Sequence, residues 1–228
     1  MQEFIAAFLK AYGYDEEALW QVKIDEELTM EYPVALIALG QKRIVLLCPE
    51  IEEAVQEIQY EHCGDIAALT SFLFDEQVGF TYQNVIGAYY DKAAAIAPDP
   101  RVRKLTRADA PSLKALLKAC TPEERRLAAV SMGDDLLLGF YEGQSLLGAV
   151  GGVKTGQLMD LSVIVHPGAR KKGVGAALVR QFCAVCLGQG DIPLYRHEQD
   201  NAASQALREK IGFTPAYILT GACAHYPQ

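Results

Sequence analysis

The residues best suited to chemistry lie in one short segment of the second half of the chain. An apolar run starting at residue 163 leads into Pro167-Gly168, three consecutive cations at 170–172, and then Gly173 and Gly175 at the start of a helical pattern. Glycines let a backbone approach a ligand closely with its N–H groups exposed. A helix N-terminus adds a favourable potential for anions. The segment therefore predicts a cradle for a pyrophosphate.

Two familiar phosphate-binding loops fit this segment poorly. A Walker loop requires Gly-Lys-Ser or Gly-Lys-Thr, and neither Gly173 nor Gly175 is followed by that pair. A Rossmann fingerprint requires a third glycine, and the residue there is Leu178. The remaining pattern is Arg-x-x-Gly-x-Gly after a strand. The alternative interpretation is that the loop binds no ligand and is a solvated basic turn before a helix.

Features on both sides of the loop extend this pattern. Val165-His166-Pro167 stands just before it, Asn201 follows the next predicted strand, and the helix after that closes in Gly212-Phe213. At these intervals, the loop and its flanks resemble the coenzyme A site of the GNAT superfamily of N-acetyltransferases. The resemblance covers about residues 101–225. It implies the family's fold, with acetyl-CoA as co-substrate.

The elements predicted for the second half follow the order of that fold. Two of the predicted helices have clear N-terminal signals, because Asp109 and Thr121 are residue types suited to an N-cap. The chain is expected to be α/β with a mixed α+β sheet, comprising a GNAT-like acyltransferase domain at the C-terminus and a smaller α/β N-terminal domain. The predicted elements are strands at 103–105, 137–141, 145–153, 159–165, 192–197 and 213–220, and helices at 109–117, from 121, at 173–187 and at 203–210.

The resemblance implies a binding role for particular residues. The strand before the loop would pair its backbone with the pantetheine arm, the loop amides would hold the pyrophosphate, and residues after the next strand would contact the arm near the thioester. The strand residues are Val163, Ile164 and Val165. The loop residues are Arg170, Lys171, Lys172, Gly173, Val174, Gly175 and Ala176. The residues near the thioester are Asn201, Ser204 and Arg208.

The implied chemistry is direct attack of a neutral amine on the acetyl thioester, which needs a base for the amine and an acid for the departing thiolate. Many relatives carry a tyrosine as this acid seven residues after the asparagine, where this chain has Arg208. A guanidinium cannot act as an acid near neutral pH. Arg208 is therefore predicted to stabilise the thiolate, to contact the cofactor, or to be an exposed helix cation. Ser204, Tyr195 and His197 are the remaining candidates for the acid, and Glu198 is the candidate base.

The first half of the chain carries no catalytic motif, and its charge differs from that of the second half. Residues 1–100 hold 18 Asp and Glu against 5 Lys and Arg, whereas residues 101–228 hold 11 against 16. Pro98-Asp99-Pro100 reads as a linker, which predicts domains at 1–97 and 101–228. The first domain is interpreted as a degenerate second copy of the fold, a cap that shapes the acceptor pocket, or a dimerisation module. Its predicted elements are helices at 2–12, 15–22, 50–60 and 63–74 and strands at 34–39 and 44–47.

Composition narrows the class of protein. The chain has 228 residues, of which 50% are hydrophobic and 22% charged, which is typical of a folded globular protein. No apolar run approaches the roughly 18 residues that span a bilayer, and the start of the chain lacks a signal peptide pattern. The acidic first half argues against nucleic acid as a partner. Six scattered cysteines predict neither a disulfide scaffold nor a metal site.

These observations favour one function over two others. The leading hypothesis is a cytoplasmic, metal-free N-acetyltransferase that moves an acetyl group from acetyl-CoA to a primary amine of a small molecule or peptide. The substitution at Arg208 motivates the alternative of a non-catalytic acyl-CoA-binding or regulatory protein. A third hypothesis is a module whose basic loop binds an acidic protein. Neither a membrane nor a nucleic acid is expected as a partner. The sequence does not distinguish a monomer from a homodimer.

Overall fold

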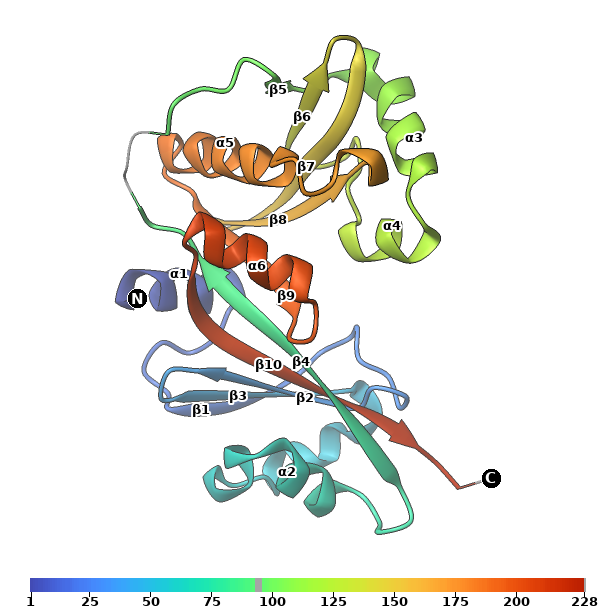
Figure 1. The fold of residues 1–228 in the computed structure, drawn as a ribbon. Coiled ribbons are helices and arrows are strands. Elements are labelled where there is room, and N and C mark those ends of the chain that lie inside the picture. The colour runs from blue at the N-terminus through green and yellow to red at the C-terminus, as the bar shows by residue number, and fades with distance from the viewer. Residues whose placement is uncertain (93–95, 228) are drawn as a thin grey trace. The chain divides into compact units, whose positions relative to one another are not determined.

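The computed structural model describes residues 1–92 and 96–227. Its chain forms two compact units, each assembled from separate stretches of sequence. Unit 1 comprises Met1–Gly87, His197–Ala202 and Pro215–Gln228, and unit 2 comprises Ala88–Arg196 and Ala203–Thr214. Figure 1 shows the path of the chain through them.

Unit 2 is built on strands in the order β9-β8-β7-β6-β5. Neighbouring strands are antiparallel except β8 and β9, which run parallel because α5 connects them as a crossover. Nearly every element predicted for this half is present. The bounds are β5 (Val102–Lys104), α3 (Ala110–Ala119), α4 (Pro122–Ala128), β6 (Leu136–Glu142), β7 (Ser145–Thr155), β8 (Leu158–Val165), α5 (Val174–Gly188), β9 (Ile192–Glu198) and α6 (Ala202–Ile211).

Helices cover both faces of this sheet, because side chains on each strand alternate between them. Leu138 and Val150 pack with the buried face of α5, while their neighbours Leu137 and Ala149 pack with α3. Figure 1 shows α5 lying across β6, β7 and β8. The strand residues thus fix the position of α5, whose first turn follows the predicted phosphate loop.

Unit 1 has the strand order β1-β3-β2-β10-β4. The hairpin predicted at 34–47 is confirmed, with β2 and β3 antiparallel and Gly40 at φ +58° in its turn. β10 lies antiparallel to the other side of β2. The bounds are α1 (Gln2–Ala11), β1 (Trp20–Ile24), β2 (Val34–Leu39), β3 (Lys42–Leu47), α2 (Ile66–Leu73), β4 (Gly79–Tyr89) and β10 (Thr214–His225), with 3-10 turns at Pro49–Gln56 and Tyr60–Gly64.

Two predictions for unit 1 are wrong or incomplete. The helix predicted at 15–22 is absent, because the Asp15 carboxylate accepts hydrogen bonds from the backbone N–H groups of Glu17 and Ala18, at 2.8 and 3.2 Å. Such a local turn competes with a helix, and Trp20–Ile24 instead pairs in parallel with β3. The 3-10 turn Pro49–Gln56 replaces the helix expected at 50–60, and β4 was not predicted.

The two predicted N-caps of unit 2 behave differently. Thr121 caps α4 as expected, accepting from the Glu124 amide at 3.2 Å while the Glu124 carboxylate accepts from the Thr121 amide at 2.9 Å. Asp109 does not cap α3, and that prediction is wrong. Its carboxylate turns back to accept from the Thr106 amide at 2.8 Å and from Arg103 Nη2 at 2.7 Å, so Arg103 holds the pKa of Asp109 well below its ordinary value.

Glycines on β7 allow α5 to approach the sheet closely. A Cβ at Gly152 would overlap the Phe182 ring, and one at Gly148 would lie 2.9 Å from Leu178 Cδ1 and 3.0 Å from Val174 Cγ1. Ordinary Cβ contacts are longer than this, so the separation between α5 and β7 depends on these glycines. Separately, no helix among the described residues is long and apolar enough to cross a membrane.

We expect Gly152→Ala to lower the free energy of unfolding by about 1–3 kcal/mol, because the added methyl forces α5 away from the sheet. Chemical denaturation monitored by circular dichroism measures this change. Gly188→Ala, at the end of α5 where an added Cβ meets nothing within 4 Å, is the matched control and should not destabilise the protein. Equal stability of both variants would contradict the close-packing argument.

Candidate functional site

The end of β8 has an open edge. β8 pairs with β7 along its whole length, from Leu158 to Val165, but its pairing with β9 covers only Leu158–Leu161. Beyond Leu161, β8 has no β9 partner among the described residues. This stretch contains Val163, Ile164 and Val165, the strand residues predicted to pair with a ligand. Exposed strand edges offer N–H and C=O groups to an extended ligand.

The loop after β8 presents a run of backbone N–H groups. Within the described part of the chain, the amides of Lys171 to Ala176 donate to no protein acceptor, and the first α5 amide that does is that of Ala177, at 3.0 Å from the Gly173 carbonyl oxygen. Lys171 and Gly173 adopt left-handed conformations, with φ of 61° and 85°. Backbone turns of this kind gather successive N–H groups into an anion-binding concavity. The segment predicted from sequence as a pyrophosphate cradle therefore presents successive amides in such a turn, and its ligand stays a prediction.

The two loop glycines serve different purposes. Gly173 needs its positive φ, which costs other residues strain. At Gly175 an added Cβ would lie at ordinary distances, 3.5 Å from Val165 Cγ2 and 3.8 Å from Leu207 Cδ2. Protein packing alone therefore does not demand glycine at 175, whereas a ligand lying close to the backbone would.

Arg170 braces the loop with its side chain. Its Nε donates to the Val165 carbonyl oxygen at 3.2 Å, and its Nη1 lies 2.7 Å from Glu124 Oε1. The ion pair with Arg170 lowers the pKa of Glu124 to about 2. Arg170 thus ties the loop to β8 and to the start of α4, while Lys171 and Lys172 are exposed and have no ion-pair partner in the residues described. The sequence around Glu124 shows only a capping pattern and gives no sign of its ion pair with Arg170.

Two predicted catalytic residues of unit 2 are in contact. Tyr195 is buried on β9, and its hydroxyl forms a hydrogen bond with Ser204 at the start of α6. Burial raises the pKa of Tyr195, and the Ser204 hydrogen bond opposes that rise. The Tyr195 hydroxyl is therefore protonated near neutral pH, and its raised pKa makes it a weaker acid than an exposed tyrosine.

Arg208 is buried and not an exposed helix cation. Its side chain lies on the inner face of α6 and the residue is 8% exposed. Among the described residues its Nε has no hydrogen-bond partner, and its Nη2 lies 3.2 Å from Glu209 Oε1. A buried guanidinium with an unsatisfied donor favours an anion nearby.

The other predicted residues lie in the stretch His197–Ala202 of unit 1, where His197 and Glu198 end β9 and Asn201 precedes α6. His197 Nδ1 donates to the Glu198 carbonyl oxygen at 2.7 Å, which leaves Nε2 as the basic nitrogen of the neutral ring. The Asn201 amide donates to the same Glu198 carbonyl at 3.1 Å. His197 and Asn201 are therefore both held by the Glu198 carbonyl oxygen at the end of β9.

A carboxylate on β8 was not among the predicted site residues. Asp160 pairs with Arg196 of β9. Burial raises the pKa of Asp160, and Arg196 opposes that rise. Asp160 lies on a strand whose sequence is mostly apolar, so the sequence does not indicate its ion pair with Arg196.

The two cysteines of α5 are buried and unreactive. Cys183 and Cys186 are fully buried, and all six cysteines are free of disulfides. Burial raises the pKa of Cys183 and raises that of Cys186 to about 12. Among residues 1–92 and 96–227, no group of three or more His, Cys, Asp or Glu side chains is arranged to hold a metal ion.

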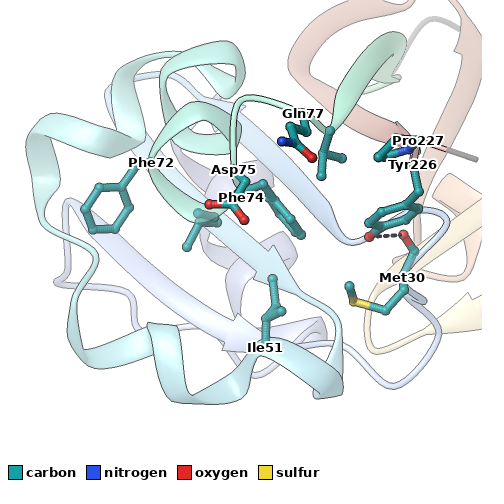
Figure 2. A pocket seen from close by; sticks show the side chains of 10 residues that line it. Met30, Ile51, Phe72, Phe74, Asp75, Gln77, Tyr226 and Pro227 are labelled. Atoms are coloured by element: carbon teal, nitrogen blue, oxygen red, sulfur yellow. Dashed lines mark hydrogen bonds between the residues drawn. The ribbon is translucent and has the colours of Figure 1, made fainter.

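Unit 1 has a hollow of its own, shown in Figure 2. It has a volume of about 580 Å³ and is lined by aromatic and aliphatic side chains, including Phe72, Phe74 and Tyr226. The Tyr226 hydroxyl donates to the Met30 carbonyl oxygen at 3.0 Å and closes one side. Its described lining contains one carboxylate, Asp75, and neither Lys nor Arg, so it does not suit a phosphate.

Comparisons with known proteins identify a family and similar folds. The model of the Acetyltransferase (GNAT) family matches residues 100–213. A structure described as a GNAT-family acetyltransferase from Novosphingobium aromaticivorans DSM 12444 is 20% identical and covers 67% of this chain and 69% of its own, with a TM-score of 0.52. A GNAT-family acetyltransferase from Colwellia psychrerythraea is 17% identical and covers 79% and 76%, with a TM-score of 0.54. The search of curated proteins found no match.

We expect Glu124→Gln to lower the free energy of unfolding at pH 7, where the ion pair with Arg170 is intact. The folded-state pKa of Glu124, about 2, lies below the ordinary value of 4.5. Its contribution is therefore complete above pH 4.5 and is lost as the pH falls toward 2. Denaturant titrations at a series of pH values should show the difference between wild type and variant shrinking across that window.

Glu142→Gln removes the same charge from the exposed last residue of β6 and is the control. If the difference in the free energy of unfolding between wild type and Glu124→Gln stayed constant with pH, as for the control, the contact between Glu124 and Arg170 would not depend on the carboxylate charge.

Proposed function

Because the chain belongs to the GNAT family of acetyltransferases and is an acyltransferase, we propose that it transfers an acetyl group from acetyl-CoA to a primary amine of a small molecule or peptide. The observation that carries the proposal is the run of backbone amides from Lys171 to Ala176 without protein acceptors. These amides suit a pyrophosphate. The adjacent open edge of β8, at Val163 to Val165, suits an extended arm with amide groups.

Acetyl-CoA supplies an activated thioester when it is bound, and the chain must then orient it and move protons. The amides of residues 171–176 hold the pyrophosphate, and Ile164 with its neighbours Val163 and Val165 pairs with the arm. Asn201 contacts the arm close to the thioester. Gly175 permits close approach of the ligand to α5.

Proton transfer is assigned to groups with hydroxyl or imidazole chemistry. Tyr195 and its partner Ser204 are the candidates for delivering a proton to the departing sulfur. His197 is a further candidate acid once its Nε2 has taken up a proton, and Glu198 is the candidate base for the amine. Arg208 supplies positive charge to the departing thiolate or to the bound cofactor, since its buried Nε needs an acceptor.

Charge favours an amine acceptor. Unit 1 contains 18 Asp and Glu against 4 Lys and Arg, a net charge of −14, and unit 2 contains 11 against 17, a net charge of +6. Primary amines are cations at neutral pH, and an acidic surface raises their local concentration. We propose that residues 1–97 shape acceptor binding and that residues 101–228 are the transferase domain.

A second function has one observation in its favour. The buried Arg208 replaces the tyrosine acid of many relatives, as a non-catalytic acyl-CoA-binding or regulatory protein would permit. The two functions differ in turnover. The test measures the release of free CoA thiol from acetyl-CoA in the presence of a polyamine, an aminoglycoside or a lysine-rich peptide. At least one of these amines should raise the rate of release above that of hydrolysis without amine. Binding of acetyl-CoA without release across the panel would favour the second function.

We expect Gly175→Asp to weaken acetyl-CoA binding at least about tenfold, because its carboxylate would face the pyrophosphate. The fold should tolerate it, since the added Cβ makes ordinary contacts and an acidic residue suits the first turn of a helix. Isothermal titration calorimetry measures the affinity. Gly175→Asn is the isosteric neutral control and should bind several times more tightly than Gly175→Asp. Equal affinities of the two variants would argue against a bound anion at this turn.

We expect Arg208→Met to lower kcat about 10- to 100-fold with little change in the KM for acetyl-CoA, since a charge that stabilises the thiolate acts mainly in the transition state. Arg208→Lys keeps the charge and should retain more of kcat. Steady-state thiol release measures both variants. A rise in KM with kcat unchanged would instead assign Arg208 to ground-state binding of the cofactor.

A further inference from the structure

The hollow of unit 1 has two walls that come from distant stretches of the chain. Phe74 and Asp75, in the loop after α2, lie on one side of it, and Met30 and Tyr226 lie on the other (Figure 2). Its volume of about 580 Å³ falls within the range of small-molecule sites. None of these four residues belongs to the proposed acetyl-CoA site, so the proposed function gives the hollow no role.

Protein contacts hold both walls in place. The Phe74 amide donates to the Thr70 carbonyl oxygen at 3.0 Å at the end of α2, and the centroids of the Phe74 and Phe80 rings are 5.2 Å apart. On the other side, the Ala224 amide of β10 donates to the Glu31 carbonyl oxygen at 2.9 Å. The hollow is therefore a preformed feature of unit 1, held by contacts within the protein.

The lining is mostly apolar and rich in aromatic rings. Phe72, Phe74 and Tyr226 supply the rings, and Met30 and Ile51 add a thioether and an aliphatic side chain. Aromatic rings attract organic cations through their negative faces. The apolar part of a ligand also gains free energy when it leaves water for such surroundings.

The charge around the hollow is negative. Asp75 is exposed, and its carboxylate has no hydrogen-bond or ion-pair partner in the described part of the chain. Glu50 is also exposed and stands next to Ile51 of the lining. The stretch 44–91, which supplies most of the lining, contains nine Asp and Glu and neither Lys nor Arg. Such a distribution raises the local concentration of cations.

These features select among classes of ligand. The carboxylates repel an anion, and a neutral apolar molecule leaves Asp75 without a partner. A cation with an apolar body uses both the rings and the carboxylate. Because Asp75 is exposed, the cation keeps part of its hydration when it pairs there, so the ion pair avoids the cost of full burial.

We propose that the hollow of unit 1 binds a small organic cation with an apolar body, an alkylammonium or arylalkylammonium ion, whose charge pairs with Asp75 while its apolar part lies against Phe74 and Met30. The inference concerns unit 1 alone. It stands whether or not the chain transfers an acetyl group, because it uses no residue of the proposed acetyl-CoA site.

The test compares three probes of similar shape by isothermal titration calorimetry on the full chain at pH 7. They are 2-phenylethylamine, which is a cation, 2-phenylethanol, which is neutral, and 3-phenylpropanoate, which is an anion. The wild type should bind the amine at least about fivefold more tightly than the alcohol, and the anion most weakly. In Asp75→Asn the affinity for the amine should fall to about that for the alcohol. Retained binding of the alcohol, with an unchanged circular dichroism spectrum, would show that the variant is folded.

Glu76→Gln is the matched control, because it removes the neighbouring carboxylate, which is exposed but does not line the hollow. It should keep the wild-type preference for the amine. Equal affinities of the wild type for the amine and the alcohol, or no binding of the amine, would overturn the proposal. An unchanged affinity for the amine in Asp75→Asn would also overturn it, because the amine would then bind elsewhere, as at an acceptor site of the transferase. Equal losses in Asp75→Asn and Glu76→Gln would reduce the effect to general surface charge and refute the assignment of Asp75.

Discussion

The start of α5 imposes a constraint that organises the rest of unit 2. Six successive amides there find no acceptor in the described protein, and unpaired N–H groups at a helix start must be satisfied from outside the helix. Keeping them together requires two left-handed residues, a helix held closely on β7 through Gly148 and Gly152, and the ion pair of Arg170 with Glu124. Each of these features costs conformational freedom, and together they fix the loop geometry that we propose binds an anion.

The parts of this site that depend on local geometry could be read from the sequence. Gly173 signals a positive φ, and Thr121 with Glu124 signals a capping box, because each depends on residues within one turn. The hairpin at Gly40 and the strand and helix around the loop follow from the same short-range rules. The Acetyltransferase (GNAT) family match over residues 100–213 confirms the resemblance on which the loop assignment was based.

The parts that depend on distant contacts could not be read in this way. Residues 15–22 have a helical pattern, but a local Asp15 turn and pairing of Trp20–Ile24 with β3 override it. Asp109 is a good N-cap by position, but Arg103 and Tyr141 bind its carboxylate instead. The burial of Arg208 likewise depends on how α6 packs, which periodicity alone leaves undecided. Propensity is a weak prior wherever tertiary contacts compete with it.

The buried thiols of α5 have a consequence for an enzyme that handles thioesters. A thiolate attacks a thioester readily, whereas the protonated thiol does not. With a pKa of about 12, Cys186 is ionised in only about one molecule in 10⁵ at pH 7, and the pKa of Cys183 is raised as well. Both side chains are also closed to solvent. Under the proposed function, α5 would therefore carry two sulfur atoms that resist self-acylation and exchange with the thiol product, which would keep the acyl group for the acceptor.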